Sequence, residues 1–364
     1  MQFRSRPFRR SAALAVPWSL VALLPCLIVG SALARGVEPV RVFILAGQSN
    51  MEGKGSVALL ERQLAAPETH DEFAGLRPDG GWISRPDVWI KFWDRHGPLT
   101  VGYGSPGCIG PELGFGLTVG DRLEAPVLLI KTAWGGRSVF CDFRPPGAGP
   151  PPAERLNREL ANARKRNPDA TMEEVRARYG QAYRDMILEV RGTLATLGTL
   201  FPEYQGQGYQ LAGFVWFQGW NDMIDPEATG EYADNLAALI RDVRRDLGVP
   251  GLPVVVGQMG VDGLAGNDNP GMRAFKEAQA AAVRRPEFTG NATLVPTDVF
   301  WDQQADAVFR QGWKEHREEW DQVGSNYPFH YLGSVRTMLA IGRALGEAAL
   351  KLDATPGGWG SGSP

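Results

Sequence analysis

The sequence predicts a three-layer α/β/α protein with about five mostly parallel strands. Short, continuous apolar runs recur along the chain, as is typical of strands buried on both faces. Amphipathic helical patterns separate several of these runs, and such alternation favours a parallel sheet covered by helices on both sides. The five runs lie at residues 40–46 (VRVFILA), 127–130 (VLLI), 214–217 (FVWF), 254–256 and 293–295.

The helices between the strands have recognisable starts and ends. Thr171 and Glu174 form a capping-box pattern that opens a helix. Apolar residues at helical spacing from Tyr232 to Leu247 predict a second helix, which Gly248 ends. Residues 334–350 predict a last amphipathic helix.

Length and composition exclude several classes of protein. The 364 residues are 43% apolar and 22% charged, which is the composition of a globular protein and excludes a disordered, collagen-like or coiled-coil chain. The 38 basic and 41 acidic residues give a net charge of −3, so we expect no nucleic-acid partner. No cysteine and histidine spacing is typical of a zinc site, and we expect no metal.

The first 34 residues are predicted to be a secretory signal. A basic start precedes an apolar run at residues 12–29, and small residues at 31–34 offer a cleavage site after Ala34. The alternative is a membrane anchor, but the run is close to the ~18-residue minimum and contains two prolines. The sequence therefore predicts a secreted or periplasmic protein with no membrane association after cleavage.

We expect one domain over residues 35–354 and a flexible tail at 355–364. The Pro/Gly stretch and charged helical segment at residues 145–197 are interpreted as a surface excursion from the sheet. Two cysteines remain in the mature chain, Cys108 and Cys141. Export permits a disulfide between them, and two buried free thiols are the other possibility.

Candidate catalytic groups follow the ends of the predicted strands, where open α/β sheets bind ligands. Ser49 lies in residues 47–53 (GQSNMEG), directly after the first strand. It is either a nucleophile or a residue that caps a turn or helix. Gly135 and Gly136 follow the second strand and can present a backbone N–H to a ligand oxygen, although a plain turn would use them too.

Amide and imidazole groups complete the set. Gln218 and Asn221 follow the third strand, and an amide donor beside backbone N–H groups is what an oxyanion hole requires. His330 precedes the last helix, in the right topological place to return to Ser49 as a general base. A lone histidine is otherwise more often structural.

The motifs resemble those of a known superfamily. Residues 47–53 resemble the nucleophile block of the SGNH hydrolases. More narrowly, they resemble the sialate O-acetylesterase-like branch, which includes the acetylxylan esterases of carbohydrate esterase family six. The other matching blocks, in chain order, are residues 110–113 (GPEL), 134–136 (WGG), 217–219 (FQG) and 219–222 (GWND). This resemblance implies an SGNH-hydrolase (flavodoxin-like) fold over nearly the whole mature chain.

The resemblance also implies roles for particular residues. Ser49 corresponds to the nucleophile and His330 to the base. The oxyanion donors are the N–H of Ser49, the N–H of Gly136 and the Asn221 side chain, with Gly135 in place of Gly136 if the register slips by one. The implied reaction is deacetylation of an O-acetylated sugar, such as acetylxylan or an acetylated sialic acid-like sugar, through an acetyl-Ser intermediate without a metal or organic cofactor.

Two positions depart from the family pattern. The family usually has an aspartate three residues before the histidine, where this chain has Tyr327. Asp321 or Asp298 could supply the acid instead; a backbone carbonyl could hold the imidazole in a Ser–His dyad; or the enzyme is weakened or lost. The second departure is Trp220, where the branch usually has glutamate.

Several residues are candidates for contacts with the substrate. Gln48 and Gln218 are expected to line the pocket, and Trp134 and Trp220 are the first candidates to stack on a sugar ring. Arg137 could bind an acidic sugar or be a solvated loop charge. Two other functions remain open, a non-catalytic carbohydrate-binding protein and a lipase- or thioesterase-like SGNH hydrolase. The latter predicts a wide apolar groove.

Overall fold

The computed structural model describes residues 38–353. The predicted signal segment 1–34 and the tail at 355–364 lie outside the described residues, so both stay predictions. Within the described part, a seven-stranded sheet has the strand order β4-β3-β6-β1-β7-β8-β9. Strand β4 is antiparallel to β3, and all other neighbours are parallel. The strands are β1 (Val40–Gly47), β3 (Ser84–Phe92), β4 (Arg95–Thr100), β6 (Val127–Ala133), β7 (Tyr209–Phe217), β8 (Val254–Gln258) and β9 (Ala292–Pro296).

All five predicted strands are confirmed as β1, β6, β7, β8 and β9. The sequence analysis missed β3 and β4, which form one edge of the sheet. Strand β3 begins with exposed polar residues and contains Pro86, and β4 is largely polar (RHGPLT). Strand β4 is the edge strand, and neither it nor the first half of its neighbour β3 has the continuous apolar run of a strand buried on both faces. A separate two-stranded sheet pairs β2 (Gly55–Ser56) with β5 (Cys108–Ile109).

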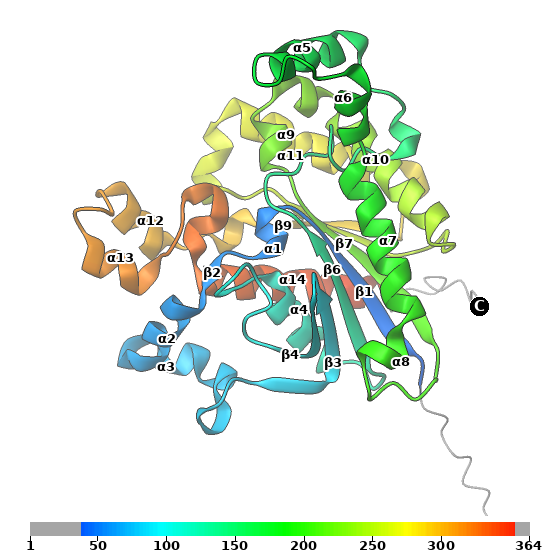
Figure 1. Cartoon of the computed structure of the whole chain (residues 1–364). Coiled ribbons are helices and arrows are strands. Elements are labelled where there is room, and N and C mark those ends of the chain that lie inside the picture. The colour runs from blue at the N-terminus through cyan, green and yellow to red at the C-terminus, as the bar shows by residue number, and fades with distance from the viewer. Residues whose placement is uncertain (1–37, 354–364) are drawn as a thin grey trace, which may run out of the picture. The chain divides into compact units, whose positions relative to one another are not determined.

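Helices cover both faces of the sheet (Figure 1). Helices α4 and α14 pack against each other on one face, and α7, α10 and α11 lie side by side on the other. This is the arrangement that right-handed crossovers require, because the chain moves to one side of β1 first and to the other side later. The helices are α1 (Ser49–Glu52), α2 (Val57–Ala65), α3 (Pro67–Phe73), α4 (Pro111–Gly120), α5 (Ala153–Arg164), α6 (Met172–Arg178), α7 (Gln181–Ala195), α8 (Leu197–Leu200), α9 (Trp220–Met223), α10 (Pro226–Asp246), α11 (Pro270–Val283), α12 (Gln303–Arg310), α13 (Arg317–Val323) and α14 (Val335–Asp353).

Close packing between α4 and α14 depends on glycine. A Cβ atom on Gly342 would lie 2.1 Å from the carbonyl oxygen of Pro111, and one on Gly114 would lie 2.3 Å from that of Leu339. The two backbones therefore approach more closely than any side chain would permit. This contact fixes α14, the helix that follows His330, against the helix that begins within the GPEL block.

The structure corrects the interpretation of residues 145–197. Helix α7 packs on β6, and its residues Tyr183, Met186 and Val190 belong to the main core. It is therefore a layer of the fold rather than an excursion. Only α5 and α6 project outward, around a small separate apolar cluster. The Thr171–Glu174 capping box at the start of α6 is confirmed.

The two cysteines of the described part are free thiols. Cys108 lies in β5 and is partly exposed, whereas Cys141 is buried in the loop after β6. Burial raises the pKa of the Cys141 thiol to about 12. The disulfide is therefore not formed, and the free-thiol alternative describes the structure.

Candidate active site

Three motif loops leave the sheet at the same level. Gly47 at the end of β1 is in register with Ala133 at the end of β6 and with Phe217 at the end of β7. The chain runs to opposite sides of β1 before and after this point, which is the topological switch where open α/β sheets bind ligands. The loops that carry Ser49, the glycine pair and Asn221 therefore start side by side.

Ser49 begins the one-turn helix α1 and is 5% exposed. The turn before it requires glycine, because a Cβ on Gly47 would lie 2.1 Å from the carbonyl oxygen of Phe217. Across the loop, an ideal Cβ on Gly135 would come within 4.0 Å of the Cβ of Ser49. Gly136 is left-handed, with φ +71°, and has open space around it. Gly135, the alternative oxyanion donor, thus lies against Ser49. Gly136, the donor that the resemblance implies, follows it in the exposed turn.

The Asn221 amide has a defined orientation. The Gly219 N–H can only donate, so the Gln48 atom 3.1 Å from it is Oε1. Gln48 Nε2 then donates to Asn221 Oδ1 over 3.1 Å. Asn221 Nδ2 is thereby left as the group that can donate to a ligand, which is what an oxyanion hole needs from this residue.

Gln48 and Gln218 support the site from behind. Each is 2% exposed, and Gln218 Nε2 donates to Gln48 Oε1 over 3.1 Å. Tyr232 in turn donates its hydroxyl to Gln218 Oε1. The expectation that the two glutamines line the substrate pocket is therefore corrected: their polar atoms are used in orienting Asn221.

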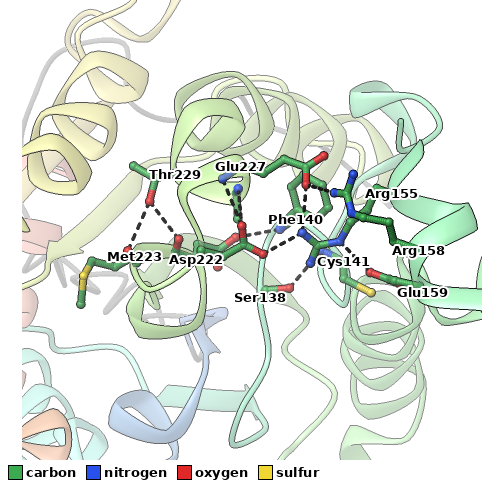
Figure 2. Close-up of polar contacts among 12 residues, drawn as sticks. Ser138, Phe140, Cys141, Arg155, Arg158, Glu159, Asp222, Met223, Glu227 and Thr229 are labelled. Carbon is green, nitrogen blue, oxygen red and sulfur yellow. Dashed lines mark hydrogen bonds and ion pairs between the residues drawn. The ribbon is translucent and has the colours of Figure 1, made fainter. Parts of the chain in front are cut away.

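Asp222 ties the loop after β6 to the GWND block (Figure 2). Its buried carboxylate accepts hydrogen bonds from the backbone N–H groups of Val139 and Phe140, each over 2.9 Å, and from Gln218 Nε2. Burial raises the pKa of Asp222 to about 7, and these three donors oppose the shift. The carboxylate thus holds the glycine-bearing loop close to Asn221.

His330 lies in the 3₁₀ segment η7 (Pro328–Gly333). Its Nδ1 is 2.9 Å from Asn326 Oδ1. The loop closes on itself, because the backbone N–H of Asn326 donates to the Leu332 carbonyl and that of His330 to the Tyr327 carbonyl. Tyr331 and Leu332 are both left-handed, with φ +52° and +59°. Such strain in two consecutive non-glycine residues is typical of functional segments.

The hydrogen bonds of Asn326 fix the tautomer of His330. The Tyr327 N–H can only donate, and it lies 2.8 Å from Asn326 Oδ1, which identifies this atom as the oxygen. The imidazole atom bonded to the same oxygen, Nδ1, must therefore carry a proton. The neutral ring then has its unprotonated nitrogen at Nε2, the arrangement of a general base.

The His330 segment is anchored beside Ser49. Asn50 Nδ2 donates to the Phe329 carbonyl over 3.1 Å, so α1 and η7 are joined at adjacent residues. Burial lowers the pKa of the His330 imidazole to about 4; the Lys54 ammonium acts in the same direction and the Glu52 carboxylate opposes it. The ring is thus neutral over most of the pH range.

Neither aspartate proposed as the imidazole's partner has that role. Asp321 on α13 pairs with Arg317 over 3.0 Å, and Asp298 pairs with Lys276 over 2.5 Å. Within residues 38–353, the polar side chain that bonds the imidazole is Asn326. An amide can approach His330 because the closed loop turns position 326 toward the ring.

Arg137, Trp134 and Trp220 are the remaining residues that the sequence proposed for contacts with the substrate. Arg137 is exposed and pairs with Asp142 over 2.9 Å, in agreement with a loop charge. Trp134 is half-buried against Phe143, with ring centroids 5.9 Å apart. Trp220 is half-buried with its ring centroid 5.5 Å from that of Phe329.

Among residues 38–353, no three acidic, histidine or cysteine side chains are grouped to hold a metal, and no helix is long and apolar enough to cross a membrane.

Sequence reasoning missed the roles of Asn326 and Asp222. It also missed the ion pair between Lys131 and Glu112, whose side chains are fully buried. The signals were present in the sequence: Asn326 is four residues before His330, and Asp222 and Glu112 belong to motif blocks. What was missing was the direction of each side chain.

Together, the fold and the site define a carboxylic ester hydrolase. Residues 39–298 match the sequence model of the family described as carbohydrate esterase, sialic acid-specific acetylesterase. This match covers most of the chain, which therefore belongs to that family of carbohydrate esterases. It includes Ser49 and Asn221 but ends before His330, so the assignment of the histidine depends on geometry.

Individual relatives are more distant. The chain is 24% identical over 231 residues to a probable carbohydrate esterase of Arabidopsis thaliana, covering 60% of this chain and 68% of that protein. The solved structure of an Arabidopsis thaliana protein aligns over 86% of this chain and 98% of that one, with 17% identity and a TM-score of 0.49. A carbohydrate acetylesterase from Xanthomonas citri aligns over 85% of this chain and 55% of its own, with 15% identity and a TM-score of 0.46.

Proposed function

We propose that this protein is a secreted serine esterase that removes O-acetyl groups from carbohydrates through an acetyl-Ser49 intermediate. The observation that carries the proposal is the hydrogen bond between His330 Nδ1 and Asn326 Oδ1, which leaves Nε2 unprotonated in a segment that Asn50 joins to the helix of Ser49. A protein that only binds sugars has no need for an imidazole held in this state. The predicted signal at residues 1–34 supports secretion, and acetylxylan and acetylated sialic acid-like sugars are the proposed substrates.

The reaction uses the groups in order. The Ser49 hydroxyl oxygen attacks the acetyl carbonyl carbon while His330 Nε2 takes its proton. The carbonyl oxygen becomes an oxyanion that accepts hydrogen bonds from the N–H of Ser49, a glycine N–H of the 135–136 pair and Asn221 Nδ2. As the intermediate collapses, the bond to the sugar oxygen breaks and the imidazolium returns its proton to that oxygen. Water then cleaves the acetyl-Ser49 by the same steps in reverse.

A substrate comparison combined with active-site labelling tests this function. We expect the mature chain to release acetate from p-nitrophenyl acetate and from acetylated xylan. Diethyl p-nitrophenyl phosphate should inactivate it, and peptide mapping should find the phosphoryl adduct on Ser49, because the activated hydroxyl attacks phosphorus and expels p-nitrophenolate. An adduct on another residue, or acetate release that survives complete labelling of Ser49, would contradict the mechanism.

The pH dependence tests Asn326 as the imidazole's partner. We expect kcat/KM to rise with pH through a midpoint at about 4, since His330 must be neutral to act as base. Asn326→Asp would place a carboxylate on Nδ1, raise the pKa of His330 and move this midpoint upward by a unit or more. Above the new midpoint the rate should increase by about tenfold, because a charge-assisted hydrogen bond exceeds a neutral one by about 1–1.5 kcal/mol.

The matched control is Asn162→Asp, which adds the same charge on the exposed face of α5. It should leave both the midpoint and the rate as they are. Asn326→Ala should lower the rate without raising the midpoint. If Asn326→Asp leaves the midpoint near 4, Asn326 is not the group that orients the ring.

A further inference from the structure

A cavity adjoins the segment that leads to His330. Its volume is about 190 Å³, and it is formed by α12, α13 and the segment that leads into η7. Trp320 is 3% exposed and contacts Phe309 and Trp313, with ring centroids 5.7 and 5.8 Å apart. Tyr327, which is 53% exposed, stands at the edge. Four of the seven lining residues are therefore aromatic, and Arg317, Ser325 and Asn326 supply the polar part of the wall.

A row of aromatic rings connects this cavity with the active site. The Tyr327 ring is stacked on Phe329, with centroids 5.5 Å apart and an angle of 11° between the planes. Phe329 in turn lies 5.5 Å from Trp220 in the GWND block, one residue before the oxyanion donor Asn221. One face of Tyr327 is covered by Phe329, and its exposed face could carry a sugar ring, because the C–H faces of sugars pack on aromatic faces.

Asn326 belongs to both sites. Its Oδ1 is occupied by His330 Nδ1 and the Tyr327 N–H, so Nδ2 is the atom that remains to donate within the cavity. Arg317 also lines the cavity, but its charge is compensated by Asp321 over 3.0 Å. One amide donor, a compensated cation and aromatic walls suit the hydroxyl groups of a neutral sugar better than a carboxylate.

The size of the cavity limits the ligand to one ring. Pockets for drug-sized ligands begin at about 300 Å³, and this cavity is smaller. It is lined by Asn326, the partner of the imidazole, which places its occupant next to the residue that carries the ester.

We propose that this cavity is a subsite for a neutral pyranose ring of the substrate, next to the acetylated residue. The proposal rests on the proposed function for its substrate class, since it makes the enzyme prefer acetylated oligo- and polysaccharides to acetylated monosaccharides. Tyr327, which stands where the family has an aspartate, is then a substrate-binding residue.

Binding to the inactive full-length mature chain tests the subsite independently of catalysis. With Ser49→Ala as the background, xylotetraose, cellotetraose and mannotetraose are titrated by calorimetry. We expect at least one to bind, and adding Trp313→Ala or Tyr327→Ala should raise its Kd roughly tenfold or more. Tyr327→Phe, which keeps the ring, should bind as the background does. The control Tyr209→Ala removes a 45% exposed ring at the opposite end of β7 and should change nothing.

The outcomes separate this proposal from the function. If none of the three neutral sugars binds, or if Trp313→Ala and Tyr327→Ala leave Kd unchanged, the subsite is wrong even where the wild type is an active esterase. Preferential binding of a tetragalacturonate, which is acidic, would overturn the assignment of the subsite to a neutral sugar. In the active chain, Trp313→Ala should raise KM for acetylated xylotetraose about tenfold more than KM for p-nitrophenyl acetate. An equal effect on both would mean that Trp313 only maintains the structure.

Discussion

Ser49→Ala is expected to abolish esterase activity, lowering kcat by roughly 10⁴-fold or more. The alanine has no hydroxyl to form the acetyl-enzyme, and Nε2 of His330 is then left without a proton to accept. The oxyanion donors stay in place, so any residual rate reflects binding and electrostatic stabilisation alone. Initial rates of p-nitrophenol release from p-nitrophenyl acetate measure the effect.

A matched serine controls for the substitution itself. Ser84→Ala removes a hydroxyl from an exposed position at the start of β3 and should keep full activity. The thermal midpoint of Ser49→Ala should stay close to that of the wild type, because the loop is held by Gly47, Gln48 and Asn50 rather than by the Ser49 hydroxyl. Retention of more than a tenth of the wild-type rate would show that another residue is the nucleophile.

Lys131→Met is expected to destabilise the protein by about 3–5 kcal/mol. Lys131 and Glu112 form an ion pair over 2.7 Å, and both side chains are fully buried. The ammonium also donates to the carbonyl oxygens of Glu52 and Tyr103, over 2.7 and 2.8 Å. Burial lowers the pKa of Lys131, and the carboxylate of Glu112 opposes this. Removing the cation leaves a buried, uncompensated carboxylate, and urea unfolding measures the cost.

Two controls isolate the buried charge. Combining Lys131→Met with Glu112→Gln should recover most of the loss, because the neutral amide has no charge to compensate. Arg284→Met breaks the exposed pair with Glu277, whose side chains are 69% and 66% exposed, and should cost at most about 1 kcal/mol. If Lys131→Met costs no more than Arg284→Met, the buried pair does not stabilise the fold.

The buried pair also affects the site, because its hydrogen bond to Glu52 holds the last residue of α1. Lys131→Met should therefore lower activity in addition to stability, and the double variant should recover stability more fully than activity. This separation can be measured on the same preparations.

Sequence reasoning identified the elements whose signals are local. The strands β1, β6, β7, β8 and β9 were predicted because each has a short, continuous apolar run. Ser49, Asn221 and the glycine pair were predicted because parallel strands bring their carboxyl ends to one edge. The edge strand β4 and its neighbour β3 were missed because exposed polar residues interrupt that run. Helix α7 was taken for an excursion because its apolar stripe does not reveal which surface it covers.

The parallel sheet, the three motif loops and the candidates Ser49, Asn221 and His330 could be predicted from the sequence. The folded structure was needed to show that Asn326 rather than Asp321 or Asp298 holds the imidazole. It also showed that Gln48 and Gln218 orient Asn221 and that the two cysteines are free. Apolar periodicity is a property of neighbouring residues along the chain. A hydrogen-bond partner instead depends on where a loop closes and which way each side chain points, and here two left-handed residues, Tyr331 and Leu332, close the loop that turns Asn326 toward His330.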